Sequence, residues 1–398
     1  MKLSKTLEIP YYSISSLVMI LFIGCGEIEE IAEVETLPIS GITDVSAWAS
    51  GSILSIGKSI IIDKGFCWSM ETRPDKDDAF ISVSDGTDNF SGLLTELSPD
   101  TRYYVRAYAS SETVISYGNE VNFKTLTAGE KPQIIADHKV IDKFDAIPQE
   151  YINKVKEMWL VYAGESHSLS VRNGLLSLET LDPKYAVSVV ESGTPEAYTS
   201  ANLRASRATW GDYSRTSGWI YSYGEEDWFS NTTAPIRTKA GITYCNTNNL
   251  TIGAMGFGWC WDPAIYTTSD FNMYIDATDQ YIAHCTTMGY PTKIFFTTGT
   301  VDIYYDELGY QKYLGNEMIR NHVKVGTDRI LFDYADILCY DEGSETPNTY
   351  TWNGHTYPII TNKNLNPVTP GHISATGSLR LAKAMWWMLA RMAGWDGE

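Results

Sequence analysis

The stretch Met158-Trp159-Leu160-Val161-Tyr162-Ala163-Gly164-Glu165-Ser166-His167-Ser168 places an apolar run directly before a short polar turn. The run predicts a buried strand over Met158–Ala163, and a helix pattern continues through Leu169 to Leu178. A serine between a strand's carboxyl end and a helix's amino end lies in a crevice where free backbone N–H groups can stabilise an oxyanion. The same turn also fits a simple helix cap by Ser166 or Ser168. If other parts of the chain supply catalytic partners for Ser166, the interpretation as a nucleophile is favoured over that as a helix cap.

The segments around this stretch alternate between apolar strands and helices, which is typical of a parallel sheet with helices on both faces. Further strands are predicted at Ala186–Val190, Lys293–Thr298 and Arg329–Phe332, and helices at Pro148–Lys156, Ser269–Met288, Leu308–Lys324 and Thr376–Met392. In the last helix Trp386 repeats with other apolar residues at helical spacing, which predicts a core position. Residues 192–268 are rich in Trp, Tyr, Ser and Asn. Irregular insertions of this kind commonly build the binding site at a sheet's carboxyl edge.

Residues 37–127 contain short β-rich runs separated by Gly, Asp, Ser and Pro, which indicates an antiparallel sandwich. The strongest strand patterns are Ser59–Ser69 and Tyr103–Ala109. In the second strand, Tyr103, Val105 and Ala107 are expected on one face, because side chains alternate along a strand.

The run Leu97-Ser98-Pro99-Asp100-Thr101-Arg102-Tyr103 resembles the corner signature of fibronectin type III domains, and Gly65–Ser69 and Tyr117–Val121 resemble the bacterial version. The resemblance implies an all-β sandwich over residues 37–127 that spaces or presents a second domain, with glycan binding as the lesser alternative. A linker over Thr127–Pro132 joins it to the α/β domain, residues 133–398.

The first residues have the pattern of a secretory signal, with Lys2 and Lys5 before a short apolar segment. Leu21-Phe22-Ile23-Gly24-Cys25 resembles a bacterial lipobox, and the following glutamates resemble the export signal of surface lipoproteins in Gram-negative bacteria. The resemblance implies a signal peptide over residues 1–24, lipidation of Cys25 and an acidic tether over residues 25–36. We therefore expect an outer-membrane lipoprotein exposed at the cell surface, which contacts the membrane only through its lipid.

Composition limits the classes of partner. The 398 residues exceed one ordinary domain, and the net charge of -19 argues against nucleic acid as a partner. Cys67 lies in an apolar strand pattern and is expected to be a buried thiol. Cys245 and Cys260 are the first pair to test for a disulfide, because both lie in a loop-rich region of an exported protein.

Two residues far apart in the chain suggest acyl transfer, with Ser166 as nucleophile and His372 as base. The α/β domain resembles the SGNH, or GDSL-like, hydrolases, whose first block Gly-Asp-Ser is matched by Gly164-Glu165-Ser166. The family's final histidine, before the last helix, is matched by His372. The resemblance implies a flavodoxin-like three-layer α/β/α fold and an esterase, lipase or carbohydrate deacetylase activity.

Besides Glu165, which replaces the aspartate of Gly-Asp-Ser, the sequence departs from that family at two further positions. The third block appears as Gly299-Thr300-Val301-Asp302, so Val301 stands where an asparagine donates to the oxyanion. Thr369 stands where an aspartate normally orients the histidine. Asp302, Asp333 or Asp336 can replace it, and Asp302 is the first choice.

For the oxyanion, the resemblance implies Gly211 as a second N–H donor. His167 and Trp210 are the candidate substrate contacts. The pattern contains no metal-ligand spacing and no phosphate-binding loop, so we expect neither a metal nor a cofactor.

These observations together predict a lipoprotein esterase that removes acyl groups, such as acetyl, from carbohydrate. A non-catalytic glycan-binding lipoprotein with the same fold is the alternative, favoured by Val301 and Thr369. A third possibility is an adhesive surface protein in which residues 37–127 are the binding part.

Overall fold

A computed structural model describes residues 32–39, 41–57, 60–84, 88–129, 132–164, 166–190, 200–207, 228–230, 232–259, 265–301, 305–326, 328–368 and 372–397. The chain divides into two compact units, with the boundary between Glu130 and Lys131. Each unit has its own apolar core.

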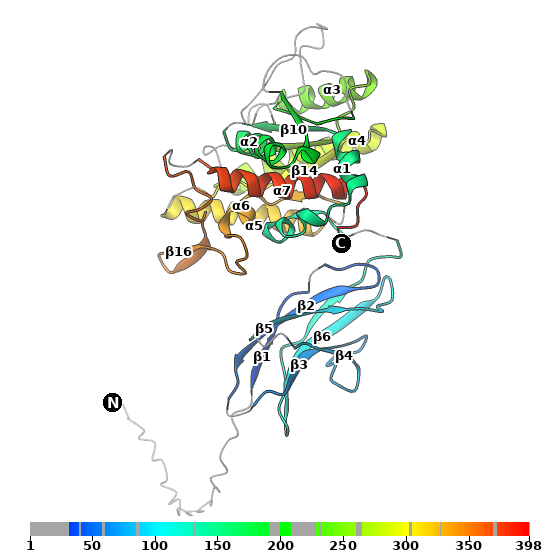
Figure 1. Ribbon diagram of the computed structural model, residues 1–398, viewed down its shortest axis with the longest axis vertical. Coiled ribbons are helices and arrows are strands. Elements are labelled where there is room, and N and C mark those ends of the chain that lie inside the picture. The colour runs from blue at the N-terminus through cyan, green and yellow to red at the C-terminus, as the bar shows by residue number, and fades with distance from the viewer. Residues whose placement is uncertain are drawn as a thin grey trace, which may run out of the picture. The chain divides into compact units, whose positions relative to one another are not determined.

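The first unit is an antiparallel β-sandwich (Figure 1). One sheet has the order β1-β2-β5, and the other has the order β4-β3-β6-β7, with β8 also paired to β6. The strands are β1 (Glu33–Thr36), β2 (Ala47–Ser55), β3 (Asp63–Ser69), β4 (Ala79–Ser82), β5 (Asn89–Leu94), β6 (Arg102–Ser110), β7 (Ile115–Tyr117) and β8 (Val121–Lys124). The apolar side chains of both sheets form one core between them, so the predicted sandwich is confirmed.

The corner before β6 is built as its sequence predicts. Tyr103 is buried, and its hydroxyl accepts a hydrogen bond of 2.9 Å from the backbone N–H of Ser98. This bond back to a preceding backbone group is the tyrosine corner of fibronectin type III-like sandwiches. Val105 and Ala107 also face the core, as expected from the alternation along β6.

The strand predicted at Ser59–Ser69 is shorter in the structure, because β3 begins only at Asp63. Asp63 pairs with Ser110, the last residue of β6, so the residues before Asp63 have no neighbouring strand in that sheet. Ile60 and Ile62 are exposed instead, by 84% and 60%. The prediction of a strand through the isoleucine run was therefore wrong.

The second unit contains a seven-stranded parallel sheet in the order β11-β12-β10-β13-β14-β15-β9. Its strands are β9 (Ile135–Ala136), β10 (Trp159–Gly164), β11 (Val187–Val190), β12 (Leu203–Ser206), β13 (Ala254–Gly258), β14 (Lys293–Thr297) and β15 (Leu331–Phe332). The central strand β10 is buried along its whole length.

Helices cover both faces of this sheet. Side chains of α1 (Gln149–Lys156), α2 (Ser166–Leu181) and α7 (Ala375–Met392) join one apolar cluster. Side chains of α3 (Ala234–Thr247), α4 (Thr268–Met288) and α5 (Glu307–Lys324) join a second cluster. Because the side chains of β10 alternate between the two clusters, the clusters lie on opposite faces of the sheet.

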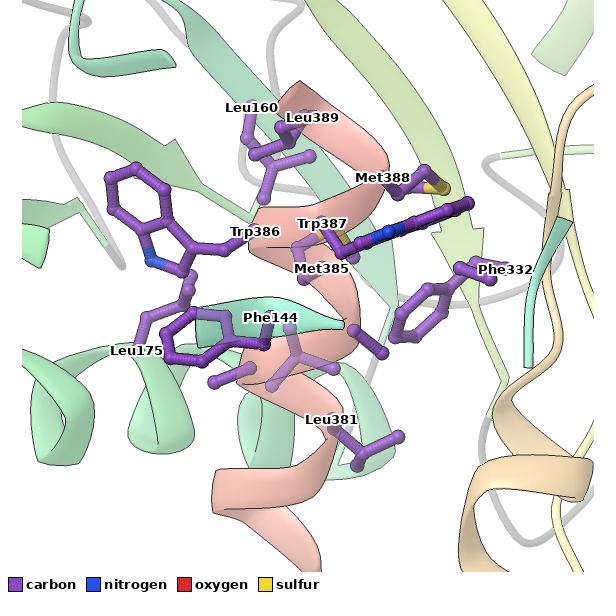
Figure 2. Packing of buried hydrophobic residues seen from close by; sticks show 14 of the residues in the cluster. Phe144, Leu160, Leu175, Phe332, Leu381, Met385, Trp386, Trp387, Met388 and Leu389 are labelled. Atoms are coloured by element: carbon purple, nitrogen blue, oxygen red, sulfur yellow. The ribbon is translucent and has the colours of Figure 1, made fainter. Parts of the chain in front are cut away.

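The carboxyl-terminal helix α7 is buried along most of its length, and its side chains point into the core in Figure 2. Trp386 is fully buried, which confirms its predicted core position. It meets the ring of Tyr185 edge to face, at 5.1 Å between centroids. Helix α2 approaches α7 closely at Gly174, where a Cβ atom would lie 1.9 Å from the carbonyl oxygen of Ser378.

The predicted α/β elements are largely confirmed, with end shifts of one or two residues at most of them. The sequence patterns missed the elements within residues 192–268, namely β12, α3 and β13. They also missed the short helix α6 (Tyr334–Cys339) and the hairpin of β16 (Thr349–Trp352) and β17 (His355–Pro358).

The ends of β10 and β13 are in direct contact. Gly164 pairs with Gly258 in the sheet register, and its φ of 114° is unfavourable for any side chain. A Cβ atom at Gly164 would lie 1.7 Å from the carbonyl oxygen of Gly258. A Cβ atom at Gly258 would lie 2.5 Å from the Cβ of Ser168 in α2. Both positions therefore require glycine, and they set where α2 begins.

We expect Gly164→Ala to lower the free energy of unfolding of the second unit by more than about 3 kcal/mol, because clash and backbone strain add. Gly289→Ala is the matched control, since Gly289 has a φ of 67° but no atom within 4 Å of its added Cβ. That change costs only about 1 kcal/mol, from the backbone alone. Denaturant unfolding measures both, and equal losses would contradict the role given to the β10–β13 contact.

Candidate functional site

The first turn of α2 is fastened to the end of β10. The Ser168 hydroxyl donates to the carbonyl oxygen of Gly164 at 2.8 Å. Nη1 of Arg172 donates to the Ser168 hydroxyl at 3.0 Å and to the carbonyl oxygen of Tyr162 at 3.1 Å. Ser168 and Arg172 are both buried. The strand, the turn and the helix are thus held by polar groups that solvent does not reach.

Ser166 is the first residue of α2. The side chain of Ser166, and Glu165 before it, lie outside the residues that the structure describes. The first N–H groups of a helix have no partner within the helix, and the helix dipole makes that end positive. Ser166 therefore stands at a backbone position suited to an oxyanion, at the carboxyl edge of the central strand.

The structure brings His372 next to the start of α2. The rings of His372 and His167 lie nearly parallel, with their centroids 6.5 Å apart. His167 is buried and meets Tyr334, the first residue of α6, edge to face at 6.0 Å. His372 is exposed, and its carbonyl oxygen accepts from the Asn366 N–H at 2.8 Å. Three segments distant in the chain thus meet at the residue that follows Ser166.

A second histidine site lies further along the same edge, after β9. Nδ1 of His138 lies 2.5 Å from Oδ2 of Asp336 in α6, and the His138 backbone N–H donates to the same oxygen at 2.8 Å. The imidazole stacks on Tyr340 at 3.5 Å between centroids. Nε2 of His138 is buried without a hydrogen-bond partner among the described residues. The His138–Asp336 pair therefore links the end of the edge strand β9 to α6.

Asp333 is the centre of a separate buried network. It forms a two-point ion pair with Arg320, with bonds of 2.7 and 2.8 Å. Its Oδ1 also accepts from the Thr298 hydroxyl at 2.9 Å and from the Asp336 N–H at 3.2 Å, which caps α6. Through these bonds Asp333 links the end of β14, α5 and α6.

The carboxyl groups of this edge differ in acidity. Burial would raise the pKa of Asp336, but hydrogen bonds from His138 and the positive charges of His138 and Arg320 hold it below its usual range. Desolvation, and next the negative charge of Asp336, raise the pKa of Asp137 to about 6. The pKa values of these two neighbouring aspartates are therefore shifted in opposite directions.

The loop after β14 contains the predicted third block. The Gly299 N–H donates to Oδ1 of Asn316 in α5 at 2.7 Å. Val301 packs against the same apolar cluster as α7, so its side chain serves the core. Asp302 lies outside the described residues, and so do Trp210, Gly211 and Cys25.

Of the three predicted acid partners, the two that the structure describes are engaged elsewhere. Asp333 binds Arg320, and Asp336 binds His138. In the sequence, His138 is only a weak candidate, because no motif surrounds it. A usable signal was its place shortly after the apolar run Ile134–Ala136, with only Asp137 between them, where a strand ends at the edge of the sheet.

Cys67 and Cys245 are both buried in the structure. Cys67 is fully buried, and desolvation raises the pKa of its thiol to about 12, which confirms the predicted buried thiol. Cys245 is buried in the second cluster, whereas Cys260 lies outside the described residues. In the described parts of the chain, no group of three or more His, Cys, Asp or Glu side chains is arranged to hold a metal ion. No described helix has the length and apolar character needed to cross a bilayer.

The chain is similar to solved β-sandwich structures. No protein-family model matches the chain, and no curated protein matches it. The sensor domain of the anti-sigma factor RsgI4 from Pseudobacteroides cellulosolvens is 21% identical, covering 24% of this chain and 95% of its own, with a TM-score of 0.19. A fibronectin type III domain of the human KIAA0970 protein is 17% identical, covering 26% of this chain and 80% of its own, with a TM-score of 0.20. Scores this low support no conclusion about function.

We expect Asp336→Ala to lower the free energy of unfolding of the second unit by about 2 kcal/mol at pH 7, because a charged hydrogen-bonded pair is lost. The pKa of Asp336 is depressed in the folded chain, so its contribution exists above the unfolded value of about 4 and disappears as pH falls through the folded value. Chemical unfolding at pH 7 and pH 3 tests this. The exposed pair Lys154–Glu150 supplies the control Glu150→Ala, with a loss below about 0.5 kcal/mol at both pH values.

Proposed function

We propose that the second unit is a serine esterase of the SGNH type that removes acyl groups, such as acetyl, from carbohydrate. One observation supports this most directly. His372, far from Ser166 in sequence, lies beside the residue that follows Ser166 at the start of α2. A serine at a helix amino terminus with a histidine alongside is the minimum set for acyl transfer at neutral pH.

In this mechanism Ser166 attacks the acyl carbonyl carbon while His372 takes the serine proton. The backbone N–H groups of Ser166 and Gly211 stabilise the oxyanion that forms. His372 then gives its proton to the departing sugar oxygen, which leaves an acyl-serine. A water molecule, deprotonated by His372, attacks the acyl-serine, and Ser166 is released with its proton restored.

The order of the strands is consistent with this family. Strands β12-β10-β13-β14-β15 run in the order 2-1-3-4-5 by their position in the chain, if the edge strands β11 and β9 are left aside. That is the order of flavodoxin-like sheets, whose ligands bind at the carboxyl ends of the strands where the order reverses. The reversal falls between β10 and β13, next to Ser166.

The acid that orients His372 is assigned by elimination. Thr369 replaces the family's aspartate, and Asp333 and Asp336 are bound to Arg320 and His138. Asp302 is the remaining one of the three, five positions after the last residue of β14 in the sequence, and is therefore our choice.

Non-catalytic glycan binding is the second candidate, and a specific observation favours it. Val301 occupies the position of the family's oxyanion-binding asparagine and packs into the core. Loss of one oxyanion donor reduces rates by about 100- to 1,000-fold in other enzymes. A chain that only binds glycan can dispense with that donor.

The location of the protein is also part of the proposal. The lipobox-like run ending at Cys25 supports a lipid anchor in the outer membrane of a Gram-negative bacterium, with the chain at the cell surface. The sandwich then spaces the esterase from the membrane. A sandwich that binds a partner by itself is the remaining alternative.

Ser166→Ala is expected to reduce hydrolysis of aryl acetates and acetylated polysaccharide by at least about 1,000-fold. It is also expected to abolish covalent labelling by a fluorophosphonate. Ser177→Ala is the matched control, because Ser177 lies on the exposed face of the same helix. Labelling that persists in Ser166→Ala, or no hydrolysis by the unchanged chain, would count against the esterase. Glycan affinity without hydrolysis would then favour the binding protein.

Asp302→Asn is expected to lower kcat by about 100- to 10,000-fold with little change in KM, because the imidazole loses its orienting carboxylate. The matched control is Asp306→Asn, since Asp306 caps α5 on the same loop through the Leu308 N–H at 3.0 Å. Equal activity of the two variants would exclude Asp302 as the acid.

A further inference from the structure

One end of the sandwich carries an unusual group of exposed aliphatic side chains. Leu54, Ile56, Ile60 and Ile62 are exposed by 56%, 54%, 84% and 60%. They belong to the end of β2 and to its connection to β3, and we call these four residues the apolar tip. Large aliphatic side chains scattered singly on a surface are ordinary, but several on one short loop indicate an interaction site.

The exposure of the apolar tip follows from how its loop is anchored. Ile53 belongs to the core, and Ile61 packs against it, so the neighbouring residues point outward. The Ile62 N–H donates to the carbonyl oxygen of Ser110 at 2.8 Å. Ile53, Ile61 and Ile62 are thus anchored to the sandwich, and the four side chains of the apolar tip are exposed to the surroundings.

The apolar tip lies at the end of the sandwich where the chain enters it. Glu33, the first residue of β1, pairs with Ser55 beside the tip. Glu33 lies eight positions after Cys25, and eight residues of extended chain span at most about 29 Å. An acyl anchor on Cys25 would therefore keep this end of the sandwich within that distance of the bilayer.

We propose that the apolar tip inserts into the bilayer that holds the acyl anchor of Cys25, as a second membrane contact. The inference rests on the lipid anchor in the proposed function. The sequence of the loop, Leu54-Ser55-Ile56-Gly57-Lys58-Ser59-Ile60-Ile61-Ile62, contains no Trp, Tyr or Arg. Those residues dominate the energetics of protein interfaces, whereas Leu and Ile partition well into the acyl region of a membrane.

The charges around the apolar tip indicate that it prefers a membrane surface without net negative charge. Glu33 and Glu35 are exposed on β1, and the tether carries further glutamates. The loop itself carries one basic residue, Lys58, against these glutamates, whereas attraction to anionic lipid requires a cluster of basic residues. The contact therefore depends on apolar burial, to a depth of about 5–10 Å for such shallow insertion, and it is weaker on anionic surfaces.

The test uses the full acylated chain in phosphatidylcholine vesicles, with Ile60→Cys carrying an environment-sensitive fluorophore. Met70→Cys is the control, because Met70 is 61% exposed but follows β3 at the opposite end of the sandwich. The unsubstituted chain gives the labelling background. We expect nitroxide-bearing lipids to quench the fluorophore at position 60 several-fold more than at position 70, and less when anionic lipid is added.

A double variant tests the side chains directly. Ile56→Ser with Ile62→Ser should reduce the quenching at position 60, and circular dichroism shows whether the sandwich remains folded. Equal, weak quenching at positions 60 and 70 in acylated protein would overturn the proposal. So would contact between labels on two chains without quenching by lipid, which would make the tip a self-association surface.

Mass spectrometry of Cys25 distinguishes a failure of tip insertion from a failure of the lipid anchor on which it rests. An unacylated Cys25 would refute the lipid anchor and, with it, the second membrane contact. An acylated Cys25 without quenching at position 60 would refute only the tip. Neither result bears on the esterase, which Ser166→Ala tests.

Discussion

The close contact between the ends of β10 and β13 is the constraint on which the second unit depends. Two glycines permit it, since neither Gly164 nor Gly258 has room for a Cβ atom. The contact lets the first turn of α2 rest on β13, where Ser168 and Arg172 fasten it to the carbonyl groups of β10. The backbone position of Ser166 is therefore determined by packing beneath it rather than by the polar turn itself.

The edge of the sheet contains histidines in two different settings. His138 is held between a carboxylate and the ring of Tyr340, and its second nitrogen is buried, so it contributes to structure. His372 is exposed beside the buried ring of His167. Burial thus separates the two histidines more clearly than the residues around them in the sequence.

Periodicity predicted most of the framework because long elements with one apolar face bury it in a regular way. Helices α4, α5 and α7 and strands β10 and β14 lie close to their predicted limits. Short elements whose burial comes from distant residues were not predictable. Strand β12 is four residues long, and its charged Arg204 is nonetheless buried over the ring of Trp159. The strand prediction for the isoleucine run before β3 was wrong for the opposite reason. That run is apolar but has no strand beside it.

The candidate site was predictable only in part. The strand, turn and helix around Ser166 and the approach of His372 follow from the chain's alternating pattern. The pairing of His138 with Asp336 could not be inferred, since it joins residues 198 positions apart through an edge strand of two residues. Aspartates after strands are equally plausible partners in a sequence, and only the fold shows that Arg320 and His138 occupy two of them.

The β-sandwich is entered at one end and left at the other. The chain enters the sandwich at Glu33, beside the end of β2, and it leaves after Lys124, which pairs with Arg102 at the start of β6. Strand β6 is nine residues long, so the two points are about 30 Å apart along the strands. Such a module has a fixed length between its entry and exit points. Copies joined head to tail would add length in regular steps of about 30 Å, whereas domains whose termini lie together would add little.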